Sequence, residues 1–273
     1  MREKTGLLLG LIFNGHPKIF KFIPDNTKFP KGSIRNVKRG GIHYQLDISD
    51  YQEWLIYFRC KSDSSLYLLD YLGQSQTILD VGANIGQTAL NMRKIQMTKG
   101  ISPAIYAFEP FPDTFEKLSR NVEKNKAQKE IHCVSLGIGS AAGILPMIKH
   151  SEANSGGYRI SPVQVPDSVD IPVSTIDAFV EEQHIQNIHF IKIDVEGFEM
   201  EVLKGARKTI QKFRPVLVFE YGIENIQAQN GNIEEALNQI LENNYKISTK
   251  EGLSDLKSIL SLNYQTDLIC TPN

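Results

Sequence analysis

The stretch TILDVGANIGQTAL, over residues 77–90, combines an acidic residue with a turn that can bind a ligand. Asp80 stands inside an apolar run, and Gly82, Asn84 and Gly86 follow it at alternate positions. Glycine adopts positive φ without strain, and asparagine tolerates it better than most residues. We predict a tight turn between a strand and a helix, because such a turn leaves backbone N–H groups at the start of the helix free to bind a ligand.

Glu109 is a second carboxylate at the end of an apolar run, AIYAFEP over residues 104–110. A carboxylate at the tip of the second strand can accept hydrogen bonds from both hydroxyls of a ribose. The turn departs from the G-x-G-x-x-G pattern of dinucleotide-binding proteins, because Asn84 replaces the middle glycine and Gly86 arrives one residue early. The two features together predict a nucleoside-bearing ligand without a pyrophosphate.

Apolar runs and helical patterns alternate after residue 75, and these elements must position the carboxylates. Nearly continuous apolar runs predict strands at 78–81, 104–110, 131–139, 188–195 and 215–221. Helices are predicted from Gln87, from Pro112 and, as one crossover helix, over 198–213. The alternation predicts a doubly wound α/β fold with a mostly parallel sheet and helices on both faces.

Residues 140–187 interrupt this alternation with a polar loop and a further strand and helix, the helix capped by Ser174 or Thr175. An insertion on the ligand side of a doubly wound sheet is a common place for a substrate pocket. We therefore predict an N-terminal segment over 1–75, forming a strand and helix cap over the core. A ligand-binding domain then follows over 76–273, with an insertion at about 140–187.

Four motifs resemble the FkbM-type S-adenosylmethionine-dependent methyltransferases: DVGANIG (80–86), AFEP (107–110), IKIDVEGFEMEVLKGA (191–206) and VLVFEY (216–221). The resemblance covers about residues 40 to 270, and the third motif is its most specific part. It implies a class I methyltransferase with a Rossmann-like seven-stranded sheet and S-adenosylmethionine as cofactor. The family's usual reaction is O-methylation, often of sugar hydroxyls in glycans or glycosylated metabolites. The cofactor-binding residues then predicted are Asp80, Gly82, Ala83, Asn84, Gly86, Glu109 and Pro110.

Asp194 and Glu196 are the predicted catalytic residues at the tip of the fourth strand, with Glu220 at the tip of the fifth. Methyl transfer to a hydroxyl requires that the hydroxyl lose its proton. A carboxylate can take this proton as a general base, or it can hold a divalent ion that acidifies the hydroxyl. We favour direct proton abstraction, since no histidine accompanies the carboxylates, but metal use stays open. The alternative is that Asp194 and Glu196 only bond the backbone of the following turn.

The composition of the chain limits the classes of partner and location that are expected. The 273 residues include 30 basic and 31 acidic side chains, so the formal charge of -1 does not favour a nucleic-acid partner. The three cysteines are far apart and lack C-x-x-C spacing, which favours a reducing, cytoplasmic location. The apolar stretch over residues 7–13 is too short to span a bilayer, so no integral membrane segment is predicted. Monomer and homodimer both stay open.

Two other classes of function remain as alternatives, namely a nicotinamide-dependent oxidoreductase and a non-catalytic nucleotide-binding domain. The oxidoreductase would need a glycine-rich turn that binds the pyrophosphate of the cofactor, and the sequence lacks that pattern. Oxygen is the predicted methyl acceptor, because residues 194–197 read DVEG where amino-directed base methyltransferases carry Asp or Asn before Pro-Pro and an aromatic residue. A small-molecule or glycan hydroxyl is therefore the predicted substrate.

Overall fold

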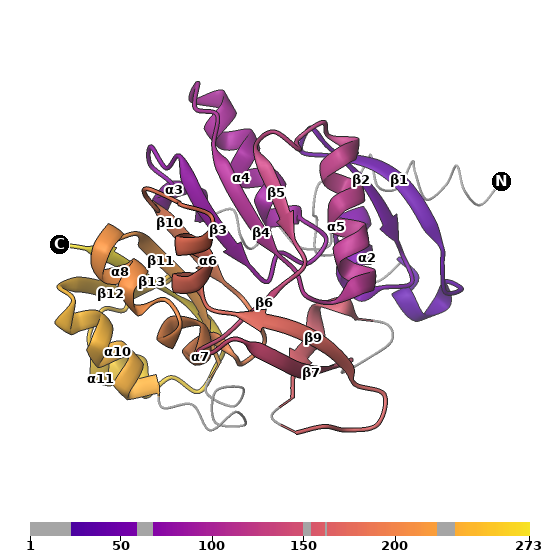
Figure 1. Ribbon diagram of the computed structural model, residues 1–273. Coiled ribbons are helices and arrows are strands. Elements are labelled where there is room, and N and C mark those ends of the chain that lie inside the picture. The colour runs from indigo at the N-terminus through magenta and orange to yellow at the C-terminus, as the bar shows by residue number, and fades with distance from the viewer. Residues whose placement is uncertain (1–22, 59–67, 150–153, 162, 223–232) are drawn as a thin grey trace.

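The computed structural model describes residues 23–58, 68–149, 154–161, 163–222 and 233–273. A central sheet has the strand order β12-β13-β11-β10-β3-β4-β5 (Figure 1). The strands from β11 to β5 run parallel, and β13 runs antiparallel to both of its neighbours. Their bounds are β3 (Thr77–Val81), β4 (Ala104–Phe108), β5 (Ile131–Val134), β10 (Phe190–Ile193), β11 (Val216–Tyr221), β12 (Tyr245–Thr249) and β13 (Thr266–Pro272). The predicted doubly wound, mostly parallel seven-stranded sheet is confirmed.

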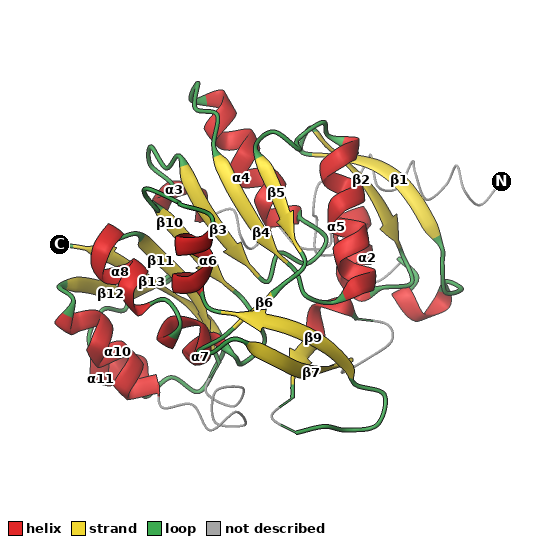
Figure 2. Ribbon diagram, viewed as in Figure 1, coloured by secondary structure: helices red, strands yellow, loops and turns green. Residues whose placement is uncertain are grey.

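Helices cover both faces of the sheet (Figure 2), which is why its central strands are apolar almost throughout. In β10, Ile191 and Ile193 pack into one hydrophobic cluster, whereas Phe190 packs into the other. The first cluster contains α6 (Ile176–Glu182), α7 (Glu199–Lys204), α8 (Arg207–Phe213), α10 (Ile233–Glu242) and α11 (Leu256–Leu260). The second contains α2 (Tyr51–Phe58), α3 (Leu68–Tyr71), α4 (Gln87–Thr98) and α5 (Pro112–Lys124).

The N-terminal part of the described chain contains a short 3-10 helix, η2 (Asn26–Lys28), and an antiparallel hairpin of β1 (Ile34–Arg39) and β2 (Ile42–Asp47). Two side chains at the C-terminal end of α5 hold the hairpin, because the Gln45 amide donates to the Asn121 side chain and the His43 amide donates to that of Asn125. The predicted strand and helix are therefore present here, and the proposed division into domains stays a prediction. The apolar stretch over residues 7–13 lies outside the described residues, among which no helix is long and apolar enough to cross a membrane.

Strands in and just before the predicted insertion form a second, four-stranded sheet with the order β6-β9-β7-β8 beside the central one (Figure 1). Its elements are β6 (Gly137–Ile138), β7 (Gly143–Lys149), η3 (Ser155–Gly157), β8 (Tyr158–Ile160) and β9 (Val169–Ser174). Of the two predicted caps for the helix after β9, Thr175 is the one used, since its hydroxyl accepts a hydrogen bond from the Ala178 amide at 3.0 Å.

Two predicted elements are wrong in extent. The single strand over 131–139 is divided into β5 in the central sheet and β6 in the small sheet, because the chain leaves one sheet for the other after Val134. The single helix over 198–213 is divided into α7 and α8. Gly205 lies at the break, where a Cβ atom would stand 2.0 Å from the Gly139 carbonyl oxygen. The Asp177 carboxylate caps the second half by accepting from the Lys208 and Thr209 amides.

Candidate active site

A cavity of about 680 Å³ opens at the carboxyl ends of β3, β4, β10 and β11. This is the edge of a doubly wound sheet at which ligands bind. The small sheet supplies part of the wall through Met147, Tyr158 and Ile160. The small sheet therefore borders the cavity, and the assignment of residues 140–187 as an insertion stays a prediction.

The turn between β3 and α4 forms one end of the cavity. Its backbone is left-handed at Gly82, Asn84 and Gly86, with φ values of 80°, 48° and 87°. The Gly82 and Ala83 amides donate to the Phe108 carbonyl, so the turn folds against the end of β4. A Cβ atom at position 82 would stand 1.8 Å from the Asp194 carbonyl oxygen. Glycine is therefore required there, both for its φ and for the close approach of the chain at the end of β10.

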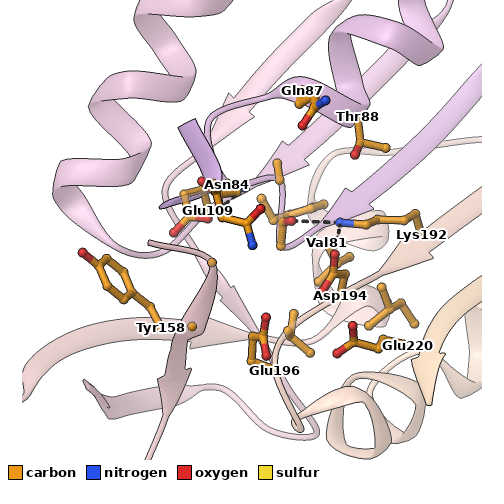
Figure 3. A pocket seen from close by; sticks show the side chains of 18 of the residues that line it. Val81, Asn84, Gln87, Thr88, Glu109, Tyr158, Lys192, Asp194, Glu196 and Glu220 are labelled. Carbon is orange, nitrogen blue, oxygen red and sulfur yellow. Dashed lines mark hydrogen bonds and ion pairs between the residues drawn. The ribbon is translucent and has the colours of Figure 1, made fainter. Parts of the chain in front are cut away.

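Glu109 anchors the turn from the tip of β4. Its Oε2 accepts from the Asn84 amide and its Oε1 accepts from the Phe111 amide, each at 3.0 Å. Burial raises the pKa of Glu109 to about 7, although both hydrogen bonds oppose this shift. The Asn84 Oδ1 atom is buried and has no hydrogen-bond partner among the described residues. Figure 3 shows Asn84 and Glu109 close together on the cavity wall.

Three acidic side chains form the other end of the cavity (Figure 3). One carboxylate oxygen from each of Asp194, Glu196 and Glu220 lies within 4.8 Å of the other two. Strand geometry brings the first and third together, because β10 and β11 are parallel neighbours and both residues lie at the carboxyl ends of these strands. Burial first, and then the charge of Asp194, raise the pKa of Glu196 to about 8 and that of Glu220 to about 9.

Glu199, rather than Asp194 or Glu196, bonds the turn after β10. Its Oε1 accepts from the Val195 amide at 3.0 Å and from the Gly197 amide at 3.2 Å. Glu196 itself has a left-handed backbone with a φ of 55°, which is uncommon for a residue other than glycine. The turn is thus held by a separate carboxylate, and Asp194 and Glu196 remain on the cavity wall.

Lys192 lies between the two ends of the cavity, although it was not among the site residues predicted from the sequence. Its Nζ is 3.3 Å from Asp80 Oδ1 and 3.3 Å from Asp194 Oδ2, and it donates a hydrogen bond to the Gly82 carbonyl at 2.9 Å. Burial opposes the charged form, but Asp194 and Asp80 outweigh it and raise the pKa of Lys192 above its ordinary value. The sequence signal that could have identified Lys192 is the presence of a lysine inside an otherwise apolar strand.

Most of the predicted site residues line the cavity: Gly82, Ala83, Asn84, Glu109, Pro110, Asp194, Glu196 and Glu220. Asp80 and Gly86 do not. Asp80 is fully buried beside Lys192, and Gly86 packs under Leu118 as α4 begins. The sequence interpretation missed several other lining residues, which come from α4, the small sheet and the C-terminal strands: Gln87, Thr88, Tyr158, Lys250, Gln265 and Asp267.

The family model of the methyltransferase FkbM domain matches residues 80–247, which is more than half of the chain. The chain belongs to this family. The matched range of the FkbM domain begins at Asp80, and it includes the glycine turn, Glu109 and the three acidic residues.

Several proteins are similar to this FkbM chain. The hexuronic acid methyltransferase AglP of Haloferax volcanii is 31% identical over 160 residues, which are 59% of this chain and 62% of the relative. The methyltransferase sdnD of Sordaria araneosa is 28% identical over 169 residues, 51% of this chain and 64% of the relative. The alignments thus span less than two thirds of these relatives. A crystal structure of an FkbM methyltransferase from Methylobacillus flagellatus matches with a TM-score of 0.48 and 21% identity, over 72% of this chain and 44% of that one.

Proposed function

We propose that the protein transfers the methyl group of S-adenosylmethionine to a hydroxyl of a sugar, a glycan or a glycosylated metabolite. One observation carries the proposal: a single cavity joins a glycine turn with its strand-tip Glu109 to a cluster of three carboxylates. The first end suits a nucleoside ligand, and the second suits removal of a proton from a hydroxyl.

The residues around the turn fit S-adenosylmethionine. Each Glu109 oxygen has lone pairs beyond the one that accepts a backbone amide, so the carboxylate can also accept from ribose hydroxyls. The unpartnered Asn84 Oδ1 offers an acceptor to the ammonium group of the methionine part. Leu136, Gly137 and Ile138 line the cavity with apolar and backbone atoms against which adenine can pack.

The carboxylates support the acceptor half of the reaction. In an in-line displacement the carbon–sulfur bond of the donor breaks while the bond from the acceptor oxygen to the methyl carbon forms, and the hydroxyl proton goes to a base. Asp194 is the proposed base, with Glu196 and Glu220 beside it. A sugar hydroxyl is the proposed acceptor, supported by the relative named as a hexuronic acid methyltransferase.

A binding and turnover experiment tests this function. S-adenosylmethionine and its demethylated product should each give binding heat in calorimetry and raise the melting temperature, because both bind only the folded protein. A panel of glycans and glycosylated metabolites incubated with the donor should then gain one methyl group by mass spectrometry. Binding heat with NAD but with neither adenosyl ligand would instead support the oxidoreductase alternative, and donor binding without turnover on any acceptor would support a non-catalytic domain.

A chelator distinguishes two routes for the proton. Three carboxylate oxygens are the kind of ligand that Mg²⁺ and Mn²⁺ prefer, and such an ion would acidify a bound hydroxyl. Activity that survives EDTA supports direct proton abstraction by Asp194, the route we favour. Activity that is lost to EDTA and restored by magnesium or manganese would assign Asp194, with Glu196 and Glu220, to a cation site.

A further inference from the structure

Lys192 contacts both ends of the cavity through one ammonium group. It is paired in register with Asp80 across β10 and β3, and strand alternation places Asp194 two residues further on the same face. Its side chain is 8% exposed, and the Asp80 side chain is fully buried. An ammonium group in such a place retains few alternative positions, because the buried Asp80 carboxylate and the Gly82 carbonyl hold it.

The three partners of Lys192 belong to different parts of the site. Asp80 and the Gly82 carbonyl belong to the strand and turn at the cofactor end, whereas Asp194 belongs to the acidic end. The Asp194 side chain is 44% exposed, so without this ion pair it would be free to adopt other rotamers in solvent. The described lysine elsewhere on the cavity wall, Lys250, is paired with Asp267 at 3.2 Å.

We propose that Lys192 is a positioning residue for methyl transfer, which fixes the Asp194 carboxylate relative to the glycine turn. The inference rests on the proposed role of Asp194 as the base. Because the turn holds the methyl donor and Asp194 takes the acceptor proton, the distance between them decides whether donor, acceptor oxygen and base are aligned. Displacement of a catalytic group by about 1 Å can cost on the order of 10²-fold in rate.

A purely structural lysine would behave differently from a positioning one. A structural role predicts that loss of the ammonium group lowers stability and slows turnover to the same degree whether or not residue 194 is an acid. A positioning role predicts that the loss in turnover depends on Asp194, because the lysine acts only through that side chain.

The test is a double-mutant cycle of Lys192→Met, Asp194→Asn and the double variant, with turnover measured at saturating S-adenosylmethionine and donor affinity by calorimetry. Lys192→Met should reduce kcat by roughly 10- to 100-fold while the donor Kd changes by less than about threefold. In the Asp194→Asn background the same change should reduce kcat by less than about twofold. Lys204→Met is the matched control, since it breaks an exposed ion pair with Glu201 outside the cavity, and its kcat should equal that of the wild type.

A second variant and a rescue keep the test decisive if Lys192→Met fails to fold around the unpaired Asp80. Lys192→Met/Asp80→Asn removes both buried charges together and should fold, while kcat still falls. In Lys192→Ala, added ethylammonium should restore part of the lost turnover, and it should restore none when Asp194 is also replaced by asparagine.

Equal losses from Lys192→Met in both backgrounds, or wild-type turnover of Lys192→Met beside an impaired Asp194→Asn, would overturn the positioning role and leave the proposed function standing. Full turnover by Asp194→Asn is a distinct outcome, because it rejects Asp194 as the base and the role of Lys192 with it.

Discussion

The two ends of the cavity are built in different ways. At the end that we propose for the cofactor, a few consecutive residues set the geometry through their backbone, and Gly82, Asn84 and Gly86 supply the left-handed conformations. At the acidic end, which we propose for the acceptor and call the acceptor end, Asp194 and Glu196 meet Glu220 only because β10 and β11 are neighbours in the sheet. One end therefore depends on local conformation, and the other depends on the order of the strands.

The ends also differ in how their charges are compensated. Glu109 accepts two backbone hydrogen bonds, and burial raises its pKa to about 7. Glu196 and Glu220 lie close to each other and to Asp194, and their pKa values rise to about 8 and about 9 by burial and by the repulsion from neighbouring carboxylates. Ionisation of Glu196 and Glu220 is thus unfavourable in the ligand-free protein, and a cationic methyl donor bound nearby would favour it.

The largest expected effect on stability and binding comes from Gly82→Ala, which tests the cofactor end, where backbone conformation sets the geometry. The new Cβ atom would overlap the Asp194 carbonyl oxygen, and the φ of 80° disfavours any side chain. We expect a loss of about 4 kcal/mol or more in the free energy of unfolding, measured by urea denaturation, and loss of donor binding.

Gly100→Ala is the matched control for this change. Gly100 has a similar φ of 76°, but a Cβ atom added there would meet no atom of the described chain within 4 Å. The Gly100→Ala variant should lose only about 1–2 kcal/mol in the free energy of unfolding, which is the cost of the left-handed conformation alone. Equal losses for the two variants would show that φ, and not the close approach of the chain after β10, determines the need for glycine at position 82.

Asp194→Asn tests whether the acceptor end acts separately from the cofactor end. Turnover should fall by roughly 10²–10⁴, the range typical for loss of a general base, while S-adenosylmethionine affinity stays nearly unchanged. Rapid-quench assays and calorimetry measure the two effects. Asp113→Asn is the control, because it removes an exposed carboxylate that is 3.7 Å from Lys149 and lies outside the cavity. Full turnover by Asp194→Asn would mean that the residue is structural.

The sequence was sufficient for features that depend on neighbouring residues. The strand before Gly82, the turn itself and the helix from Gln87 were all predicted correctly, because apolar periodicity and residues that favour positive φ are local signals. The position of Glu109 at a strand tip was predicted for the same reason. The acidic residues after β10 and at the end of β11 could be named from their motifs. The distances between their carboxylates could not be predicted from the sequence.

Features that depend on long-range contacts were missed. The helix over 198–213 was predicted as continuous because its apolar spacing is continuous, but the approach of Gly139 to Gly205 interrupts it. The role of Lys192 depends on its register against Asp80 in another strand, which no local pattern records. The role of Glu199 in the turn was likewise missed, and only the alternative interpretation gave that role to Asp194 and Glu196, since only the folded backbone brings the Glu199 carboxylate to the Val195 and Gly197 amides.

Glu109→Ala tests the cofactor end separately, and its expected effect is smaller than that of Asp194→Asn. The variant loses the carboxylate that can bind the ribose and also supports the Asn84 amide. Donor affinity should weaken by about 1.5–3 kcal/mol, the range for hydrogen bonds to a charged group, as measured by calorimetry. Glu130→Ala is the control, because it removes a buried carboxylate paired with Arg93 at a place outside the cavity. An unchanged Kd for Glu109→Ala would contradict the ribose role.

The smallest expected effect comes from Glu220→Gln and concerns the charge at the acceptor end. The folded pKa of about 9 lies above the ordinary value of 4.5, so the folded state binds more protons than the unfolded state between these values. The stability of the wild type therefore falls as the pH rises through that window, whereas a glutamine cannot ionise. Glu220→Gln should match the wild type at about pH 4.5 and exceed it by about 1–3 kcal/mol at about pH 8.5, as measured by urea denaturation.

An exposed glutamate separates this effect from a general change in net charge. Glu234→Gln removes the same formal charge from the surface of α10, and its effect on stability should stay within about 0.5 kcal/mol at both pH values. Saturating S-adenosylmethionine should also reduce the advantage of Glu220→Gln at the higher pH, because the donor's positive charge favours ionised carboxylates nearby. An advantage that is the same at both pH values would mean that Glu220 affects packing alone, and the two ends of the cavity would then not differ in their charge.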